Sequence, residues 1–566
     1  MKKLRIPTKQ KHTFEQIIKK ACKKAKVKGA NFAIVGPDKT YFSYQYGTVD
    51  ETGEPNDPKQ HMMIGSSTKM LTALAILKLH DDQLLKLDDP ITQYLPTFSI
   101  QSRLGDEAIT IRQLLMHTSG LPGDDYPLIT SESNTLSDTL DVLKKHYRTT
   151  KPNTMYAYSN LGYSLLGLII ESASNSSYTD YLKTHIFKPL KLEMKILETK
   201  KKREQHSDIL SQSFDRKGQV KEDPLSTLIS AGSSTYSTLD DLIKLMQFFM
   251  NKDPINLLRK DTLKMMLDCP DGIHKQVNSE RVGLGLRHRY YRFNSKAVGP
   301  VFGHGGNTIY HHSTFDIFPK LNIGFIAMTN SELGVKAIMQ MNLKIMLKVF
   351  KLLGIRVPKR KYAYTIVDKE LPESLKQSFL SPGLNITYKP TKSGKARYKM
   401  QLFTFTLTPC HDGYYRATPR GIIARLPLIS RVIKGLRFRP ESVGDRTVLY
   451  LEMQRKYHRI TMAFATNYEP SNITQAWEDA LGRYKPYGNE NNEKLLEFAE
   501  LKKQKDNLIL RVKMVGQVMN LYLKVINDHE AIIQGYGRNA RETVFLESQE
   551  TNHHLRVFGL ACTKEK

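Results

Sequence analysis

The sequence predicts an α+β domain over residues 10–350, followed by a mainly β C-terminal region. β-Prone runs stand near both ends of the first segment, and several helical patterns lie between them. After residues 358–361 the sequence changes to short alternating runs that are separated by turn residues. The chain of 566 residues is also too long for one small domain. We therefore expect three units, over 10–350, 362–474 and 475–566.

The N-terminal unit begins with a predicted hairpin, in which runs 31–35 and 41–46 flank the turn residues 36–39. A helix is predicted over residues 70–79, where the pattern is apolar nearly all round and therefore buried, with Ser66 or Ser67 as its N-cap. Further helices are predicted over 110–116, 161–172 and 238–250, and strands at 303 and over 323–328.

The C-terminal units are predicted to consist mainly of strands. Alternating runs occur over 398–407 and 447–453, and a second set begins near Trp477 and continues through 482–484, 508–514, 519–526, 531–535, 543–546 and 554–558. Five or more strands in so short a span favour a small barrel or a sandwich. Two related β units are compatible with this spacing.

The charge balance limits the classes of partner. Lys and Arg number 85 and Asp and Glu 56, which gives a net charge of +29 and a positive field that attracts anions and anionic lipid headgroups. No helix-turn-helix, RNP string, KH loop or zinc module is evident, so nucleic acid is not an expected partner. No HExxH, Walker A or GxGxxG pattern occurs either, and we predict no metal and no cofactor.

The cysteines and the apolar runs bear on the compartment. The four cysteines are far apart and form no CxxC pair: Cys22, Cys269, Cys410 and Cys562. This spacing indicates neither a disulfide framework nor a zinc site and favours a reducing compartment. No apolar h-region follows the basic start, and no run of eighteen apolar residues occurs. We therefore expect a cytoplasmic protein.

The first chemical motif is Ser66-Ser67-Thr68-Lys69, an SxxK tetrapeptide at the predicted start of the buried helix. The i, i+3 spacing places the hydroxyl of Ser66 and the amine of Lys69 on one face. A helix N-terminus offers a backbone N–H to a developing oxyanion, and burial favours the neutral amine that a base requires. Alone, the pattern more often marks an N-cap serine followed by a solvated lysine, because serine and lysine are both common residues.

Two further motifs follow along the chain. Tyr158-Ser159-Asn160 precedes an apolar helix, where Tyr158 is expected to pass a proton to the leaving group and Asn160 to hold Lys69 and a substrate amide. His304-Gly305-Gly306-Asn307 lies in a predicted strand, whose glycines would let a substrate lie against the backbone. The Asn307 amide would then complete an oxyanion hole with that of Ser66. Each motif alone also has a purely structural explanation, as a packed tyrosine or a Gly-rich turn.

Together, the order and spacing of these motifs resemble the serine β-lactamase and penicillin-binding-protein superfamily, in its class C-like branch of esterases and D-amino-acid peptidases. Several flanking strings support the resemblance over roughly residues 14–345: 87–90, 94–96, 114–122, 231–232, 237–242, 283–285 and 329–330. It implies an antiparallel sheet flanked by helices plus a helical subdomain. It also implies that Ser66, Lys69, Tyr158 and His304 are catalytic and that Asn160, Gly306 and Asn307 bind substrate, whereas 114–122, with His117, is a structural helix and turn.

Two departures from the superfamily pattern concern the substrate. Histidine stands at position 304 where true β-lactamases and transpeptidases have the lysine of a Lys-Thr-Gly motif, so antibiotic hydrolysis is not the expected native role. The resemblance suggests that the His304 imidazole orients Tyr158 or a polar group of the substrate. The bulky residues 309–312 are expected to narrow the cleft.

Near the C-terminus, Trp477 and Gly482-Arg483-Tyr484 resemble the opening strand of lipocalin-like domains that are appended to this hydrolase branch. Such a barrel would hold an apolar ligand, cover the catalytic cleft, or be filled by its own side chains.

The predicted function is that of a serine hydrolase that forms an acyl-enzyme on small esters, amides or peptides, including those that contain D-amino acids. The alternative is a catalytically silent binding or envelope-associated protein with the same fold.

Lys344, Lys348 and Lys351 share one face of a predicted helix whose remaining surface is apolar. That helix either packs on the sheet or lies on an anionic membrane surface, and residues 421–434 offer the same two alternatives.

Overall fold

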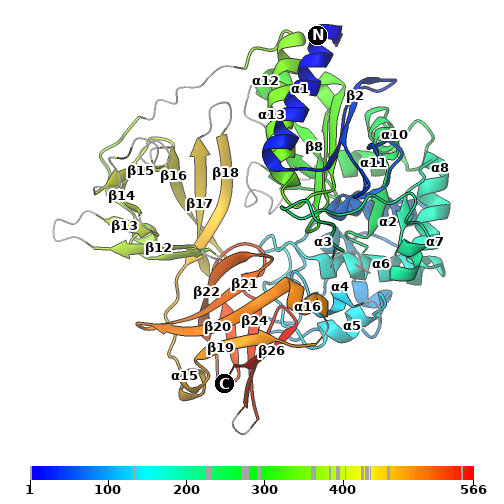
Figure 1. The fold of residues 1–566 in the computed structure, drawn as a ribbon. Coiled ribbons are helices and arrows are strands. Elements are labelled where there is room, and N and C mark those ends of the chain that lie inside the picture. Colours follow the sequence, from blue (N-terminus) through cyan, green and yellow to red (C-terminus); the bar gives the residue numbers. More distant parts are fainter. Residues whose placement is uncertain are drawn as a thin grey trace.

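Three bodies follow one another along the chain in the computed structural model (Figure 1). The structure describes residues 3–131, 134–197, 199–223, 231–268, 280–289, 295–357, 365–381, 384–390, 396–401, 403–421, 426, 433, 435–454, 459–488, 490–549 and 552–565. An α+β domain comes first and two closed β-barrels follow, so the predicted fold class is confirmed.

The N-terminal domain contains a seven-stranded antiparallel sheet in the order β2-β1-β10-β9-β8-β7-β6. Its strands are β1 (Gly29–Val35), β2 (Thr40–Gly47), β6 (Glu280–Val282), β7 (Arg287–Arg289), β8 (Val301–Asn307), β9 (His312–Phe318) and β10 (Ile323–Thr329). Strand β1, the second in this order, is buried along its whole length because helices cover both faces of the sheet. Phe32 and Ile34 face one core and Ala33 and Val35 the other, as strand alternation requires.

Helices cover the two faces of this sheet. One face packs against α1 (Thr8–Ala25) and α13 (Gly334–Leu352), and the other against α10 (Leu239–Met250). The remaining helices are α2 (Lys69–Asp81), α3 (Ile111–Leu115), α4 (Tyr126–Thr130), α5 (Asp138–Leu143), α6 (Asn160–Ser174), α7 (Tyr178–Leu182), α8 (Lys188–Leu190), α9 (Lys200–Glu204), α11 (Lys260–Leu267) and α12 (Ser295–Val298). A small sheet is formed by β3 (Met62–Met63), β4 (Lys195–Ile196) and β5 (Thr235–Ser237).

Side-chain caps explain where the predicted helices begin. Thr110 forms a capping box with Gln113 at the start of α3, and Ser159 and Thr238 cap α6 and α10. The predicted N-cap of α2 is wrong. A 3₁₀ turn, η1 (Gly65–Thr68), runs directly into α2, and no side chain caps the junction.

Helix α13, which carries Lys344, Lys348 and Lys351, packs on the sheet, as the first of the two alternatives for this segment predicts. Ile345, Met346, Val349 and Phe350 are buried against α1 and the sheet, so this apolar face lies in the interior. Of the run 421–434, only residues 421, 426 and 433 belong to the described part of the chain, so its two alternatives stay open. Among the helices that the structure describes, none is both long enough and apolar enough to cross a membrane.

The two C-terminal bodies are closed eight-stranded antiparallel barrels, so the sandwich alternative is wrong. The first contains β11 (Phe379–Ser381), β12 (Leu384–Lys389), β13 (Arg397–Met400), β14 (Phe403–Pro409), β15 (Tyr415–Arg420), β16 (Leu436–Val443), β17 (Arg446–Gln454) and β18 (Arg459–Asn467). The second contains β19 (Gly482–Pro486), β20 (Leu496–Gln504), β21 (Asn507–Met514), β22 (Gln517–Val525), β23 (Glu530–Ile533), β24 (Thr543–Gln549), β25 (Asn552–Val557) and β26 (Leu560–Lys564), with helices α15 (Gln475–Asp479) and α16 (Glu490–Leu495).

Side chains fill both barrels. Tyr398, Phe405 and Phe438 stack in the first, with successive ring centroids 5.7 Å apart. Trp477 is fully buried in the core of the second, although it lies on α15 rather than on the expected opening strand. The run 398–407, predicted as one strand, forms the two strands β13 and β14. Gln401, whose φ is 52°, turns the chain between them.

The second barrel docks on the N-terminal domain beside α4 and α5 (Figure 1). Arg103 forms an ion pair with Glu530 at 2.7 Å, and the backbone N–H of Tyr126 donates to the carbonyl of Phe558 at 3.1 Å. Thr130 donates to the side chain of Asn492 at 2.9 Å. These contacts bring a loop of the barrel to the site described next.

Candidate active site

The turn that carries Ser66 is held by close backbone contacts with strand β8. A Cβ atom on Gly306 would lie 1.7 Å from the carbonyl oxygen of Ile64, and one on Gly65, whose φ is 51°, would lie 2.9 Å from the amide nitrogen of Asn307. Only glycine permits such an approach. The glycine at 306 therefore admits the chain's own backbone at Ile64, and its contact with a substrate stays a prediction.

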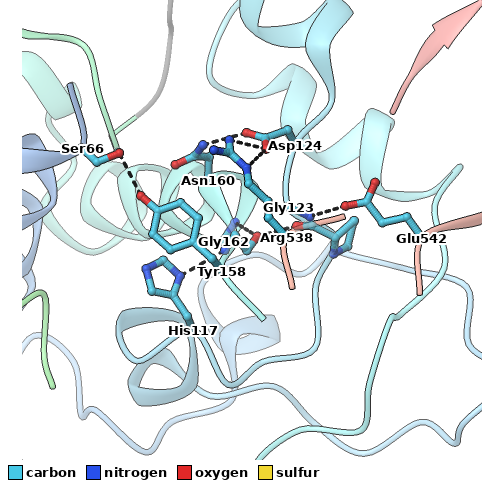
Figure 2. A network of polar contacts seen from close by, with 12 residues as sticks. Ser66, His117, Gly123, Asp124, Tyr158, Asn160, Gly162, Arg538 and Glu542 are labelled. Atoms are coloured by element: carbon cyan, nitrogen blue, oxygen red, sulfur yellow. Dashed lines mark hydrogen bonds and ion pairs between the residues drawn. The ribbon is translucent and has the colours of Figure 1, made fainter. Parts of the chain in front are cut away.

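Tyr158 lies directly against Ser66. Its hydroxyl donates a hydrogen bond to Ser66 Oγ at 2.8 Å (Figure 2). The His117 ring packs on the phenol with centroids 4.3 Å apart, and His117 Nδ1 accepts from the backbone N–H of Ser159. Burial lowers the pKa of His117 well below its ordinary value, so the imidazole is neutral. Its contacts hold the Tyr158 ring in place and involve neither Ser66 nor a substrate position. His117 thus supports the site, in line with its structural role in the resemblance.

Lys69 is fully buried one helical turn after Ser66. Its Nζ donates to Asn160 Oδ1 at 2.7 Å and to the carbonyl of Gly232 at 2.9 Å. Burial lowers the pKa of Lys69 below its ordinary value, although Tyr158 opposes this effect. A lysine in this state is suited to accept a proton.

The pKa of Tyr158 is also displaced. Burial acts to raise it, but the positive charge of Lys69 in its protonated form and that of Arg287 outweigh burial and hold the pKa of Tyr158 below its ordinary value. The guanidinium of Arg287 lies 5.3 Å from the centre of the phenol ring. A more acidic phenol exchanges a proton more readily with both neighbours.

Behind Lys69, a chain of polar contacts leads into the second barrel. Asn160 Nδ2 donates to Asp124 Oδ1 at 2.7 Å, and Asp124 Oδ2 accepts from Arg538 Nε at 2.8 Å and also from Arg538 Nη2 (Figure 2). The side chain of Asp124 is 1% exposed, whereas that of Arg538 is 48% exposed because it faces the cleft. Neither residue belongs to a motif that marks it as part of the site in the sequence.

A second contact fixes the same barrel loop. Glu542 is buried, and its Oε1 accepts from the backbone N–H of Gly123 at 2.9 Å (Figure 2). Burial raises the pKa of Glu542 to about 8, and the carboxylates of Asp124 and Asp125 act in the same direction. A Cβ atom on Gly123 would lie 3.2 Å from Asn539 Oδ1, so the loop fits closely over this glycine.

The third predicted motif lies on β8 beside this centre. His304 is 3% exposed, and its Nδ1 lies 2.7 Å from the carbonyl oxygen of Gly305, which places the proton on Nδ1. The side-chain oxygen of Asn307 lies 2.9 Å from Nδ1 of His312. The backbone of Asn307, adjacent to Gly65, is therefore the part of this residue nearest to the Ser66 turn.

A cavity of about 670 Å³ opens over Ser66. The N-terminal domain lines it with Ser66, Asn160 and Asn307, among others, and the second barrel contributes Leu495, Val515, Gly516, Gln517 and Arg538. The second barrel is thus filled by its own side chains and also forms part of the wall of the cleft. Within the described parts of the chain, no group of three or more His, Cys, Asp or Glu side chains is arranged to hold a metal ion.

The model of the Beta-lactamase family matches residues 14–346, which agrees with the span of the motifs. Protein flp of Staphylococcus aureus (strain MW2) is 28% identical over 354 residues, covering 60% of this chain and 68% of that protein. Beta-lactamase-like protein 4 of Dictyostelium discoideum is 36% identical over 182 residues, or 29% of this chain and 32% of that protein.

Solved structures show the same fold at low sequence identity. The octameric penicillin-binding protein homologue from Pyrococcus abyssi is similar with a TM-score of 0.52 and 19% identity, covering 98% of this chain and 99% of that one. SurE is similar with a TM-score of 0.57 and 20% identity, covering 80% of this chain and 98% of that one. SurE has also been solved with D-Leu.

Proposed function

The chain belongs to the Beta-lactamase family, and from this premise we propose that it is a serine hydrolase that forms an acyl-enzyme on Ser66. The observation that carries the proposal is the 2.8 Å hydrogen bond between Tyr158 and Ser66, next to a fully buried Lys69. An alcohol is a weak nucleophile until a neighbouring base removes its proton. Here a phenol touches the alcohol, and an amine lies within the same buried cluster.

The proton route follows from these contacts. As Ser66 Oγ attacks the substrate carbonyl, its proton passes to the Tyr158 oxygen while the phenol proton passes to the neutral Lys69 amine. The C–O bond to Ser66 forms, and the carbonyl oxygen becomes an oxyanion. When the tetrahedral intermediate collapses, the bond to the leaving group breaks, Tyr158 gives a proton to that group, and Lys69 returns its proton to the Tyr158 oxygen, so the amine is neutral again. Water then repeats the sequence on the acyl-enzyme and frees Ser66.

Two backbone amides are placed to stabilise the oxyanion. The amide of Ser66 belongs to the turn over 65–68, the Asn307 backbone abuts Gly65, and both residues line the cavity. We assign the oxyanion hole to these two donors. In comparable sites, loss of one donor costs roughly 3 kcal/mol of transition-state stabilisation.

The substrates that we propose are small esters, amides or peptides, including those with D-amino acids. A cavity of about 670 Å³ accommodates a molecule of a few residues. The likeness to SurE, which has been solved with D-Leu, supports a D-configured group. Histidine stands at position 304, where β-lactamases and transpeptidases have a lysine, which argues against β-lactam hydrolysis as the main activity.

Hydrolysis of p-nitrophenyl esters and of a panel of D- and L-aminoacyl amides by the wild type and by Ser66→Ala tests this function. We expect turnover by the wild type and none above background by the variant, with circular dichroism and melting temperature unchanged. Equal turnover by both proteins contradicts the assignment. Absence of turnover by the wild type on the whole panel favours the alternative of a binding protein that retains the hydrolase fold.

A further inference from the structure

A residue of the second barrel reaches the polar network behind the proposed base. Arg538 lies in the loop between β23 and β24, and it contacts Asp124 through Nε and Nη2. Asp124 in turn orients Asn160, whose oxygen accepts from Lys69 at 2.7 Å. Three consecutive contacts therefore connect the C-terminal barrel to an amine at the centre of the N-terminal domain.

The amide of Asn160 has one correct orientation in this network. A carboxylate accepts hydrogen bonds and donates none, so Asp124 draws the Nδ2 end of Asn160 toward itself and leaves Oδ1 for Lys69. Because Asp124 is 1% exposed, its negative charge has little solvent to stabilise it. The guanidinium of Arg538 supplies that stabilisation through a two-point contact.

Loss of the guanidinium would leave two outcomes, and both disturb Lys69. A carboxylate that stays charged without a partner attracts a proton onto the Lys69 amine, because an opposite charge nearby favours the ammonium form. A carboxylate that becomes protonated instead turns into a donor and no longer fixes the Asn160 amide. Asp124 raises the pKa of Lys69 and Arg538 lowers it, in agreement with the first outcome.

We propose that Arg538 is a positioning residue of the catalytic centre: by neutralising Asp124, it keeps the Asn160 oxygen on Lys69 and keeps Lys69 in its uncharged, basic form. The inference rests on the proposed function. It makes hydrolysis by the N-terminal domain dependent on a side chain that the second barrel supplies.

Contacts on both sides of Arg538 hold its loop in place. Two residues before Arg538, Tyr536 packs against Met155 of the N-terminal domain. Val448 and Tyr450 of the first barrel belong to the same small cluster. After Arg538, Glu542 accepts from the backbone N–H of Gly123. All three bodies thus meet around this loop, which explains how a residue on a barrel loop keeps a fixed position in the site.

The test is the pH dependence of kcat/KM for p-nitrophenyl acetate in the full-length chain. Arg538→Met is expected to lower kcat/KM at pH 7 roughly tenfold or more and to move the acidic limb of the profile upward by about 1 pH unit. The double variant Asp124→Asn/Arg538→Met removes both charges and retains an acceptor oxygen at position 124. It is expected to return the limb close to its wild-type position.

Two controls separate this role from simpler ones. Arg103→Met removes the ion pair with Glu530 at the same interface, outside the network, and is expected to keep the wild-type pH profile. Arg538→Lys retains the positive charge and is expected to shift the limb less than Arg538→Met. If Arg538 served only to bind substrate, both Met-containing variants would raise KM without moving the limb.

The outcomes distinguish this proposal from the proposed function. An unshifted limb in Arg538→Met, or a limb that stays shifted in the double variant, overturns the role of Arg538 and leaves Ser66 chemistry intact. An Arg103→Met profile that matches that of Arg538→Met overturns it as well, because loose docking alone would then explain the effect. A wild type without hydrolysis that depends on Ser66 overturns both proposals.

Discussion

The phenol of Tyr158 donates a hydrogen bond to the hydroxyl of Ser66 across 2.8 Å, although 92 positions of sequence separate the two residues. Two groups of contacts hold this geometry. The backbone of β8 presses on the Ser66 turn, and His117 with the N-terminus of α6 fixes the tyrosine. The pair is thus placed by rigid elements before any substrate binds, as positioning for catalysis requires.

Tyr158→Phe removes the hydroxyl and retains the ring that packs on His117. We expect kcat for ester hydrolysis to fall roughly 100- to 10,000-fold, the range that is typical of a lost general acid–base group. Tyr156→Phe, two residues earlier on the same loop, is the matched control and is expected to stay within about threefold of the wild type. Steady-state kinetics on p-nitrophenyl acetate measure both, and a similar loss in the two variants would contradict the role of Tyr158.

Lys69→Arg retains a positive charge and hydrogen-bond donors but provides no group that loses a proton near neutral pH. Because the proposed base must be uncharged, we expect a loss of roughly 100-fold or more in kcat/KM. In the wild type, activity should rise with pH through a limb below 10.5, the ordinary pKa of lysine, since burial lowers the pKa of Lys69. An active Lys69→Arg enzyme would show that charge, not basicity, is what this position supplies.

Gly306→Ala tests the contact that positions Ser66, the proposed nucleophile. The added Cβ would lie 1.7 Å from the carbonyl oxygen of Ile64, so one of the two backbones must move. We expect a loss of about 1–3 kcal/mol in the free energy of unfolding and a marked loss of activity. Gly162→Ala, where the new atom makes ordinary contacts of 3.4 Å or more within α6, should be neutral or stabilising by up to about 1 kcal/mol. Chemical denaturation compares the two, and equal stabilities would contradict the crowding argument.

Glu542→Gln tests how pH acts on the docked barrel. The pKa of Glu542 is raised to about 8 in the folded protein, against an ordinary value of 4.5, so the folded chain holds a proton there that the unfolded chain releases. This group therefore contributes stability that is fully present below pH 4.5 and declines as the pH rises to about 8. Glutamine retains the acceptor for Gly123 and cannot ionise. Thermal unfolding from pH 5 to 9 should show the variant gaining stability over the wild type as the pH rises, whereas parallel curves would contradict the prediction.

The sequence predicted those parts of the site whose residues lie on local elements. The tetrapeptide over 66–69 and the loop before α6 carry recognisable side chains at fixed spacing, and the structure places Ser66, Lys69, Tyr158 and Asn160 in one cluster. The helix starts were predictable for the same reason, since caps such as Ser159 and Thr238 act within three residues of the chain. The one cap predicted wrongly, before α2, lies where tertiary contacts replace the local pattern.

The contribution of the second barrel was not predictable from local pattern. Arg538 and Asp124 are 414 positions apart, and nothing in either neighbourhood marks them as partners before the barrel is docked. The closure of the barrels was not predictable either, because it depends on pairing between the first and the last strand of each barrel. In the second barrel, β20 and β26 were not predicted as strands. Long-range pairing is set by the whole fold and carries no short sequence signal.

Mass spectrometry of the intact chain and of its peptides, after incubation with a fluorophosphonate, shows whether Ser66 is a reactive nucleophile. We expect a single covalent adduct that maps to Ser66 and that is lost in Ser66→Ala. An unlabelled wild-type chain, or an adduct on another residue that persists in Ser66→Ala, would contradict it.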